Sequence, residues 1–111
     1  MSEIERKILC VCGQIIETPS DYMLVFVKKE MMEVDILCPN PSCFLKELGY
    51  VKFKVEEGKV SFEKAAFYSP FVTWNVARLG REFAIKTLKE HLREIVKKRI
   101  EWDRIEKELA T

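Results

Sequence analysis

Hydrophobic and polar residues alternate with a period of two over much of the N-terminal part of the chain, and this pattern predicts short antiparallel strands. In segment 8–16, apolar residues flank a turn containing Cys and Gly, which predicts a first small hairpin. The apolar run 22–27 and the alternating segment 33–37 predict a second hairpin. The alternating segments 51–55 and 60–63, joined by a turn that contains Gly, predict a third.

The spacing of apolar residues becomes helical towards the C-terminus. Ser69 is a candidate N-cap and Pro70 suits the first turn of a helix, so a helix is predicted to begin here. Gly80 is expected to split or kink that helix. Segment 81–109 contains no Gly or Pro and predicts one long helix, about 44 Å in length if continuous. A small β domain cannot cover such a helix, so we expect its second half to pack on something else.

Apolar residues recur at intervals of seven along this predicted helix and form one stripe. We expect the late part of the stripe, Trp102 above all, to contact a partner helix in a homodimer. Three earlier aromatic residues, Phe71, Trp74 and Phe83, are expected instead to dock on the sheet. The predicted interface residues are Leu88, Leu92, Ile95, Trp102 and Leu109.

Composition narrows the class of protein. The 111 residues are 48% hydrophobic and 33% charged with a net charge of +1, which excludes a globally polycationic nucleic-acid binder and a disordered acidic tail. The longest apolar run, 23–27, is far shorter than the roughly 20 residues that span a bilayer. The first residues lack a secretory signal pattern, so a reducing cytoplasmic location is expected. The scarcity of Asn and Gln beside abundant Glu, Lys, Ile and Val is typical of thermophile proteins.

Four cysteines form two close pairs, Cys10 with Cys12 and Cys38 with Cys43, and each pair lies at a predicted turn. Tetrahedral Zn²⁺ takes four thiolates at about 2.3 Å, and two turns can each present two of them. Four thiolates also close the coordination sphere, so the predicted cofactor is a structural and not a catalytic Zn²⁺. Two alternatives stay open: disulfides that run between the pairs, because thermophile cytosolic proteins can be disulfide-rich, and unliganded thiols.

The segment Cys38-Pro39-Asn40-Pro41-Ser42-Cys43-Phe44 resembles the second half of the zinc-ribbon motif in the Ogr/Delta family of phage late transcription activators, which has a Cys-x-Asn-x-x-Cys step after a hairpin. The resemblance covers residues 10–44. It implies a structural zinc held by all four cysteines in a transcription-linked module that binds DNA or polymerase. The first pair departs from the family, which has Cys-x-x-Cys where this chain has Cys10-x-Cys12.

These observations predict an α+β fold with two domains. Residues 1–68 are expected to form a small zinc-ribbon-like antiparallel β domain of hairpins. Residues 69–111 are expected to form a long C-terminal helical arm that packs on the sheet and then projects beyond it. The metal staples the two cysteine turns together in this interpretation, because so small a sheet has little other core to unite them.

Charge divides unevenly along the chain. Residues 1–77 hold 9 basic and 11 acidic side chains, a net charge of −2, whereas residues 78–111 hold 10 basic and 7 acidic, a net charge of +3. If the chain has a phosphate-binding surface, it is therefore expected on the helix. At 100° per residue, six cations share a band about 80° wide opposite the apolar stripe. The predicted nucleic-acid-binding residues are Lys86, Lys89, Arg93, Lys97, Arg104 and Lys107.

No catalytic set is found in the sequence. Gly-rich phosphate loops and nucleophile elbows are absent, and His91, the only histidine, has no nucleophile or acid partner, so it is interpreted as a buried or interfacial helix residue.

The sequence favours a non-enzymatic structural-zinc module, nucleic-acid-associated or transcription-linked, that acts as a dimer. The alternative is a protein–protein interaction adaptor or oligomerisation module without nucleic-acid contact, in which the apolar stripe is the working surface. A solvated helix face is the simplest competing reading of the basic band. No membrane contact or small-molecule substrate is indicated.

Overall fold

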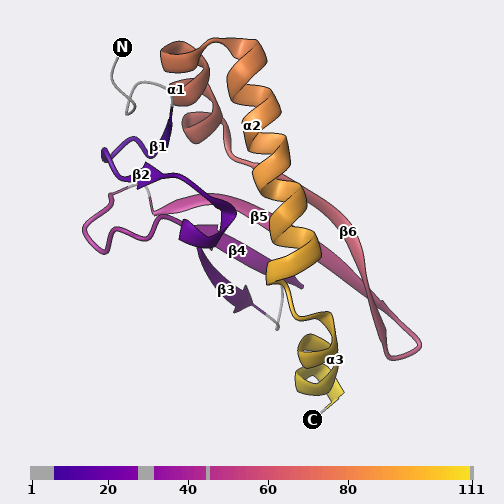
Figure 1. The fold of residues 1–111 in the computed structure, drawn as a ribbon. Coiled ribbons are helices and arrows are strands. Elements are labelled where there is room, and N and C mark those ends of the chain that lie inside the picture. Colours follow the sequence, from indigo (N-terminus) through magenta and orange to yellow (C-terminus); the bar gives the residue numbers. More distant parts are fainter. Residues whose placement is uncertain (1–6, 28–31, 45, 111) are drawn as a thin grey trace.

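The computed structural model describes residues 7–27, 32–44 and 46–110. It confirms an α+β protein in which antiparallel strands come first and helices last (Figure 1). No helix among these residues combines the length and the apolar character needed to cross a membrane. The strands are β1 (Ile8–Leu9), β2 (Ile15–Ile16), β3 (Met23–Val27), β4 (Glu33–Leu37), β5 (Glu47–Glu56) and β6 (Lys59–Phe67). The α-helices are α1 (Ser69–Leu79), α2 (Arg81–Glu94) and α3 (Trp102–Ala110), and a π-helical stretch, Ile95–Arg99, continues α2.

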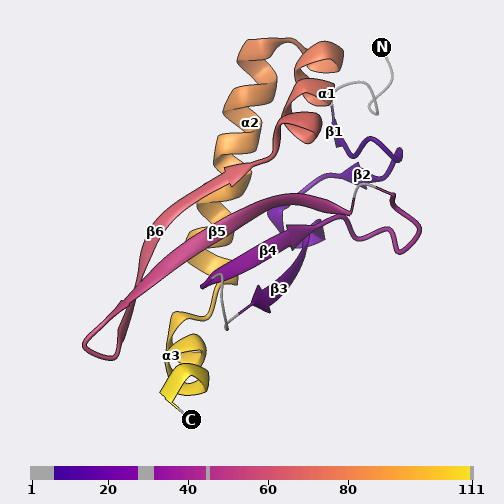
Figure 2. The ribbon, with the colours of Figure 1, turned by 180° about the vertical axis from the view of Figure 1, so that it is seen from behind.

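All three predicted hairpins are present. Strands β1 and β2 pair as a two-stranded sheet, and β3 to β6 form a four-stranded antiparallel meander in sequence order. Helix α2 lies across one face of the larger sheet, and the view from behind shows the other face without a helix over it (Figure 2). The core lies between the meander and the helices and includes Val34, Ile36, Val51, Phe53, Phe71, Leu88 and Ile95.

The third hairpin is longer than predicted and its register shifts between Lys52 and Phe53. Lys52 pairs with Lys64 and Phe53 pairs with Phe62, so Glu63 is the extra residue of a β-bulge. The alternation in the sequence places Phe53, Val55 and Phe62 on one face of this hairpin and predicts that all three are covered. Phe53 is buried, but Val55 and Phe62 are exposed. Val55 pairs with Val60 beside the turn, at the tip of the hairpin that extends away from α2 (Figure 1).

The single long helix predicted for 81–109 is wrong. Ile100 has an extended backbone (φ −89°, ψ 120°), and its amide donates to the Ile95 carbonyl at 3.1 Å, which closes a π-helical turn before the chain changes direction. The break turns α3 back onto the sheet of the same chain. Ile100 and Ile105 are then buried, and the Trp102 ring meets the Phe53 ring edge-on with centroids 6.3 Å apart. Apolar burial on both sides of the break outweighs the helical hydrogen bonds that are not formed there.

This break removes the basis of the predicted dimer interface. Leu88 and Ile95 are 3% and 0% exposed, so both are core residues of the single chain. Leu92, Trp102 and Leu109 are partly buried and pack against the same core. The prediction that the helix projects beyond its own sheet is therefore wrong. The apolar stripe packs against the core of the same chain and is not exposed for binding a partner. The homodimer stays a prediction that needs another surface.

The start of the helical region also differs in detail from the prediction. Tyr68 is the N-cap of α1, and Ser69 is the first helical residue, with Pro70 following it as expected for the first turn. Gly80 separates α1 from α2 with φ +89°, a conformation that glycine adopts readily. Phe71 is fully buried against the sheet, as predicted. Trp74 and Phe83 are exposed instead, which corrects the prediction that they dock on the sheet.

Candidate metal centre

The first cysteine turn lies between β1 and β2. The Cys10 amide donates to the Gln14 carbonyl at 2.9 Å, and the Gly13 amide donates to the Cys10 carbonyl at 2.9 Å. Gly13 has φ +97°, a conformation that side chains other than glycine adopt with strain, so glycine permits this tight turn. The two hydrogen bonds hold Cys10 and Cys12 on one compact loop.

The second cysteine turn follows β4. The Cys38 amide donates to the Lys46 carbonyl at 2.8 Å, and the Cys43 amide donates to the Asn40 carbonyl at 3.0 Å. The Asn40 side-chain oxygen accepts from the Ser42 amide at 3.0 Å, a local turn that fits the Pro-Asn-Pro sequence around it. This loop therefore closes on itself and brings Cys38 and Cys43 to the same side as the first turn.

The four cysteine sulfurs meet in one cluster. All of them lie within 4.8 Å of one another. The Sγ atoms of Cys10 and Cys43 are 3.5 Å apart, and those of Cys12 and Cys38 are 3.7 Å apart. Four sulfurs at about 2.3 Å from one tetrahedral ion would be separated by about 3.8 Å. Three of the cysteines are buried and Cys12 is partly exposed, and all four are free thiols and not disulfides in this structure. The cluster has the composition and spacing of a structural metal-binding site.

Two of the sulfurs accept hydrogen bonds from nearby groups. The Lys46 amide donates to Cys43 at 3.3 Å, and the Asn40 side-chain nitrogen donates to Cys12 at 3.5 Å. Both donors stabilise negatively charged sulfur, which is the form that binds metal. The amides of Cys12, Gln14 and Asn40 act to lower the pKa values of Cys10, Cys12 and Cys38 in the same way.

The pKa values of the thiols reflect a balance between burial and hydrogen bonding. Burial raises the pKa of Cys10 far above 9.0 and that of Cys38 to about 11. Burial also acts to raise the pKa of Cys12, but the Gln14 amide and the Asn40 side chain outweigh it and lower the pKa to about 7. A bound cation would supply the remaining stabilisation that the buried thiolates need.

Two residues outside the cysteine motif hold the centre in place. Lys46 has φ +52°, and its ammonium group donates to the carbonyls of Cys38 and Asn40 at 3.1 and 3.5 Å. It thus places a positive charge beside a cluster that carries excess negative charge when metal is bound. Asn75, fully buried on α1, binds the backbone of Leu9 next to Cys10. The sequence contains no motif that marks either residue; a lone Asn in an apolar helix face was the one available signal for Asn75.

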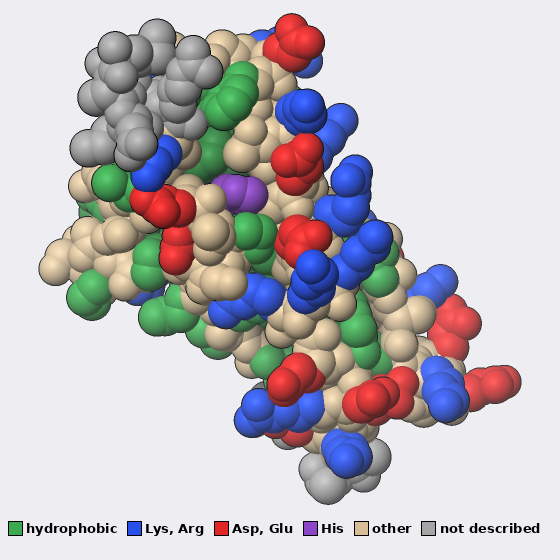
Figure 3. All heavy atoms as spheres, viewed as in Figure 1, with side chains coloured by type: hydrophobic (Ala, Val, Ile, Leu, Met, Phe, Trp, Pro, Cys, Tyr) green, Lys and Arg blue, Asp and Glu red, His purple; other side chains and the backbone are tan. Residues whose placement is uncertain are grey.

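The predicted nucleic-acid-binding residues fall into two groups, because α2 and α3 are separate helices. Lys86, Lys89, Arg93 and Lys97 are exposed on α2 and its π-helical continuation, and we call these four residues the basic face. In the space-filling view, basic side chains run down one edge of α2 beside acidic ones (Figure 3). None of the four forms an ion pair within the described ranges. A neighbouring ion pair joins Lys98 to Glu94 at 3.1 Å.

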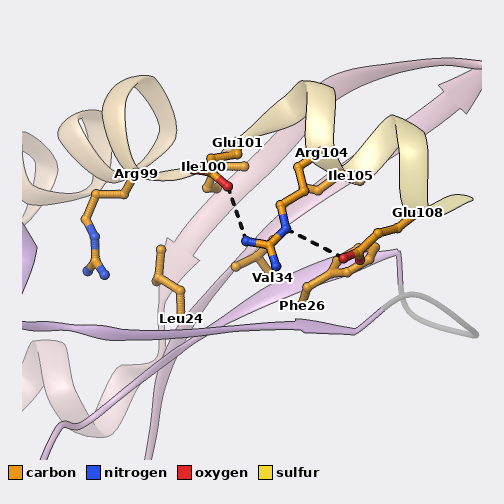
Figure 4. A pocket seen from close by; sticks show the side chains of 9 residues that line it. All are labelled: Leu24, Phe26, Val34, Arg99, Ile100, Glu101, Arg104, Ile105 and Glu108. Carbon is orange, nitrogen blue, oxygen red and sulfur yellow. Dashed lines mark hydrogen bonds and ion pairs between the residues drawn. The ribbon is translucent and has the colours of Figure 1, made fainter.

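Arg104 and Lys107 lie on α3 and do not continue the basic face, which corrects the predicted single band. Arg104 forms ion pairs with Glu101 at 3.4 Å and Glu108 at 3.7 Å. These three side chains border a cavity of about 300 Å³ between β3 and α3 (Figure 4). Its floor is apolar and includes Phe26. Because the two carboxylates neutralise Arg104, this side chain is a poor phosphate ligand.

His91 is buried, as the sequence predicted. Its Nδ1 atom lies 2.8 Å from the hydroxyl oxygen of Tyr22, and burial lowers the pKa of the imidazole. The hydrogen bond between the two side chains joins α2 to the segment before β3.

No protein-family model matches the chain, and comparison with the curated proteins and with the solved structures gives no match either. The resemblance to the Ogr/Delta family therefore stays a prediction that depends on the cysteine segment. The four-cysteine cluster on small antiparallel sheets is the part of that prediction that the structure bears out.

Proposed function

We propose that the chain is a non-enzymatic module in which one structural Zn²⁺ joins the β1–β2 turn to the turn after β4. The observation that carries this proposal is the meeting of four cysteine sulfurs, all within 4.8 Å of one another. Four thiolates favour zinc or iron, and zinc suits a closed site whose only task is to cross-link two loops. When bound, the ion supplies a cross-link and no open position for substrate or water.

Elemental analysis and mass spectrometry test the zinc proposal. One zinc per chain under native conditions, lost under denaturing conditions, is the expected result. Chelation should lower the melting temperature, because the metal contributes directly to the stability of such a small fold. A metal-free chain with a mass two or four daltons low would instead support disulfides and overturn the proposal. Bound iron would keep the tetrathiolate site but reject zinc.

For the partner, we propose nucleic acid bound at the basic face of α2. The four cations of this face are exposed and lie on one continuous stretch of helix, which spans about 17 Å from Lys86 to Lys97. Like charges repel at this spacing, and a bound phosphate backbone relieves the repulsion. The metal-bearing half of the chain is acidic overall, so the cationic helix is the surface suited to a polyanion. A transcription-linked role follows from the family resemblance.

A salt titration tests the nucleic-acid proposal. Affinity for a DNA or RNA oligonucleotide should fall steeply as salt rises, and replacing Lys89, Arg93 and Lys97 by Gln should weaken it. Lys98→Gln is the matched control on the same stretch, because that lysine is already paired with Glu94. The absence of binding at low salt would reject the proposal.

The interaction-adaptor alternative now depends on a different surface from the apolar stripe. The face of the meander opposite α2 has no helix over it in the view from behind (Figure 2). Met23 and Val25 on the edge strand β3 are exposed, and so is Tyr68, which follows β6. An adaptor would be supported if a partner protein protected this face and left the basic face exposed.

A further inference from the structure

A hollow of about 330 Å³ lies between the basic face and strand β6. Its lining combines apolar side chains with three cations of the basic face. Two residues of β6 face it from the sheet side, and five residues of α2 and its continuation face it from the helix side. The lining residues are Phe62, Ala65, Lys89, Leu92, Arg93, Val96 and Lys97.

Phe62 is the unusual member of this lining. Its side chain is 46% exposed, although it is paired in register with the buried Phe53. The bulge at Glu63 lies directly beside Phe62, and a bulge changes the direction in which neighbouring side chains project. The register therefore places an aromatic ring beside α2 without enclosing it in the core. An accessible aromatic face next to cations is the combination that stacks a planar base.

The charged side chains that line the hollow all carry a positive charge. All three charged residues of the lining, Lys89, Arg93 and Lys97, are basic. A second hollow further along α2 is lined by Arg81, Lys86 and Lys89, with Glu82 and Ile85, so Lys89 belongs to both. The two hollows thus adjoin at Lys89, and we call their basic residues together, with Phe62 at one end, the cationic path.

We propose that this path binds single-stranded nucleic acid, with a base stacked on Phe62 and the adjacent phosphates on Lys89, Arg93 and Lys97. The inference rests on the proposed function and names its substrate class. A duplex keeps its bases stacked inside the helix and could use only the cations, whereas a single strand offers an unpaired base to the ring. Leu92 and Val96 support the base from the helix side, and the three cations hold the backbone that follows it.

The test is fluorescence anisotropy of the full-length, metal-loaded protein with a labelled single strand of about 12 nucleotides and with the matching duplex. Phe62→Leu should weaken single-strand binding roughly tenfold or more while leaving the salt slope unchanged, because stacking is not electrostatic. Phe83→Leu is the matched control, since Phe83 is 43% exposed but lies outside the hollow. Circular dichroism and metal content check that each variant is folded.

The basic residues should behave differently from the aromatic one. Replacing Lys89, Arg93 and Lys97 by Gln should reduce the slope of log affinity against log salt by about 2, because each single-strand phosphate that is no longer neutralised lowers the slope by about 0.7. Lys98→Gln should leave the slope unchanged. A polyglutamate peptide of similar length serves as a competitor without bases, and it should displace the single strand poorly from the wild-type protein.

The outcomes separate the two proposals. If the single strand and the duplex bind alike and Phe62→Leu behaves as Phe83→Leu does, the stacking inference is wrong but nucleic-acid binding stands. If polyglutamate competes as well as the single strand, the path is a site for acidic polymers in general, and the inference is overturned. If neither oligonucleotide binds at low salt, both proposals fail.

Discussion

The side chain of Asn75 pairs with both backbone polar groups of Leu9, as a neighbouring strand would. Its Oδ1 atom accepts from the Leu9 amide at 2.9 Å, and its Nδ2 atom donates to the Leu9 carbonyl at 3.0 Å. The same Nδ2 atom donates to the Phe71 carbonyl within α1 at 2.9 Å. Leu9 directly precedes Cys10, so α1 holds the strand that delivers the first metal ligand.

Replacing Asn75 by Ala should therefore destabilise both the fold and the metal centre. The change leaves the amide and carbonyl of Leu9 without a side-chain partner in a part-buried place, which should cost about 2 to 4 kcal/mol of unfolding free energy. Chemical denaturation of the metal-loaded protein measures this cost, and the rate of metal loss to a chelator should rise. Thr73→Ala, an exposed change on the same helix, is the control. Equal stability of the two variants would contradict the role assigned to Asn75.

Metal removal followed by mild oxidation should give a specific disulfide pairing. The closest sulfurs belong to different turns, 3.5 Å for Cys10 and Cys43 and 3.7 Å for Cys12 and Cys38. A bridge within the first pair would be strained, because the two residues are separated by only one other. Peptide mapping after diamide treatment of the chelated protein should find the two inter-turn bridges, whereas the metal-loaded protein should resist oxidation. A Cys10–Cys12 bridge would count against the observed arrangement of the turns.

Trp102 should contribute to stability within one chain. Its ring packs edge-on against Phe53, and its indole NH donates to the Val96 carbonyl at 3.3 Å, so it holds α3 against the sheet across the break. Trp102→Ala should cost about 2 to 3 kcal/mol, less than for a fully buried Trp because the side chain is partly exposed. Hydrogen exchange should show faster exchange in α3. Sedimentation should show no change of oligomeric state; dissociation of a dimer on this substitution would restore the partner-helix interpretation.

The buried His91 should make stability fall in mild acid. Burial lowers its folded pKa below the usual 6.5, and the charges of Glu90 and Asp21 only partly oppose this shift. The unfolded chain therefore binds a proton more readily than the folded chain below pH 6.5. The stability that the neutral ring provides is complete above about pH 6.5 and is lost as pH falls through the folded pKa. Unfolding free energies from pH 8 to 5 should fall more steeply for the wild type than for His91→Gln.

Glu33 acts in the opposite direction and needs its own control. A side-chain hydrogen bond with Asp35, together with burial, raises the pKa of Glu33 from 4.5 to about 7, although Lys52 opposes the shift. Its contribution is present in full below pH 4.5 and is lost as pH rises through about 7. Glu33→Gln should remove that component, so subtracting each variant's profile from the wild type isolates the two groups. Parallel profiles for the wild type and His91→Gln would show that the histidine is not the acid-sensitive group.

Local patterns in the sequence were sufficient to predict the hairpins and the cysteine cluster. Period-two alternation marks β4 and β5 because alternate residues such as Val34, Ile36, Val51 and Phe53 are buried, and an apolar run marks β3. The two close cysteine pairs at turns indicated that the four sulfurs would meet. The end of α1 at Gly80 could also be predicted, because glycine commonly ends a helix. These features depend on residues near one another in the chain.

The break at Ile100 and the roles of Asn75 and Lys46 could not be predicted in the same way. No Gly or Pro marks Ile100, and the chain bends there because Ile105 and Trp102 become buried on a sheet that is remote in sequence. Asn75 acts on Leu9, 66 positions earlier, and neither residue carries a local signature of that hydrogen bond. The prediction that six cations share one band was wrong for the same reason. It assumed a straight helix through Ile100, whereas Arg104 and Lys107 lie on the separate helix α3.

X-ray absorption at the metal edge of the purified full-length protein, combined with its metal stoichiometry, tests the proposed zinc centre most directly. One zinc per chain with four sulfur neighbours at about 2.3 Å is the predicted result. Replacing Cys43 by Ser should change that shell or abolish binding. A wild-type protein that folds stably without metal, or a metal with nitrogen or oxygen in place of one of the four sulfurs, would contradict the proposed centre.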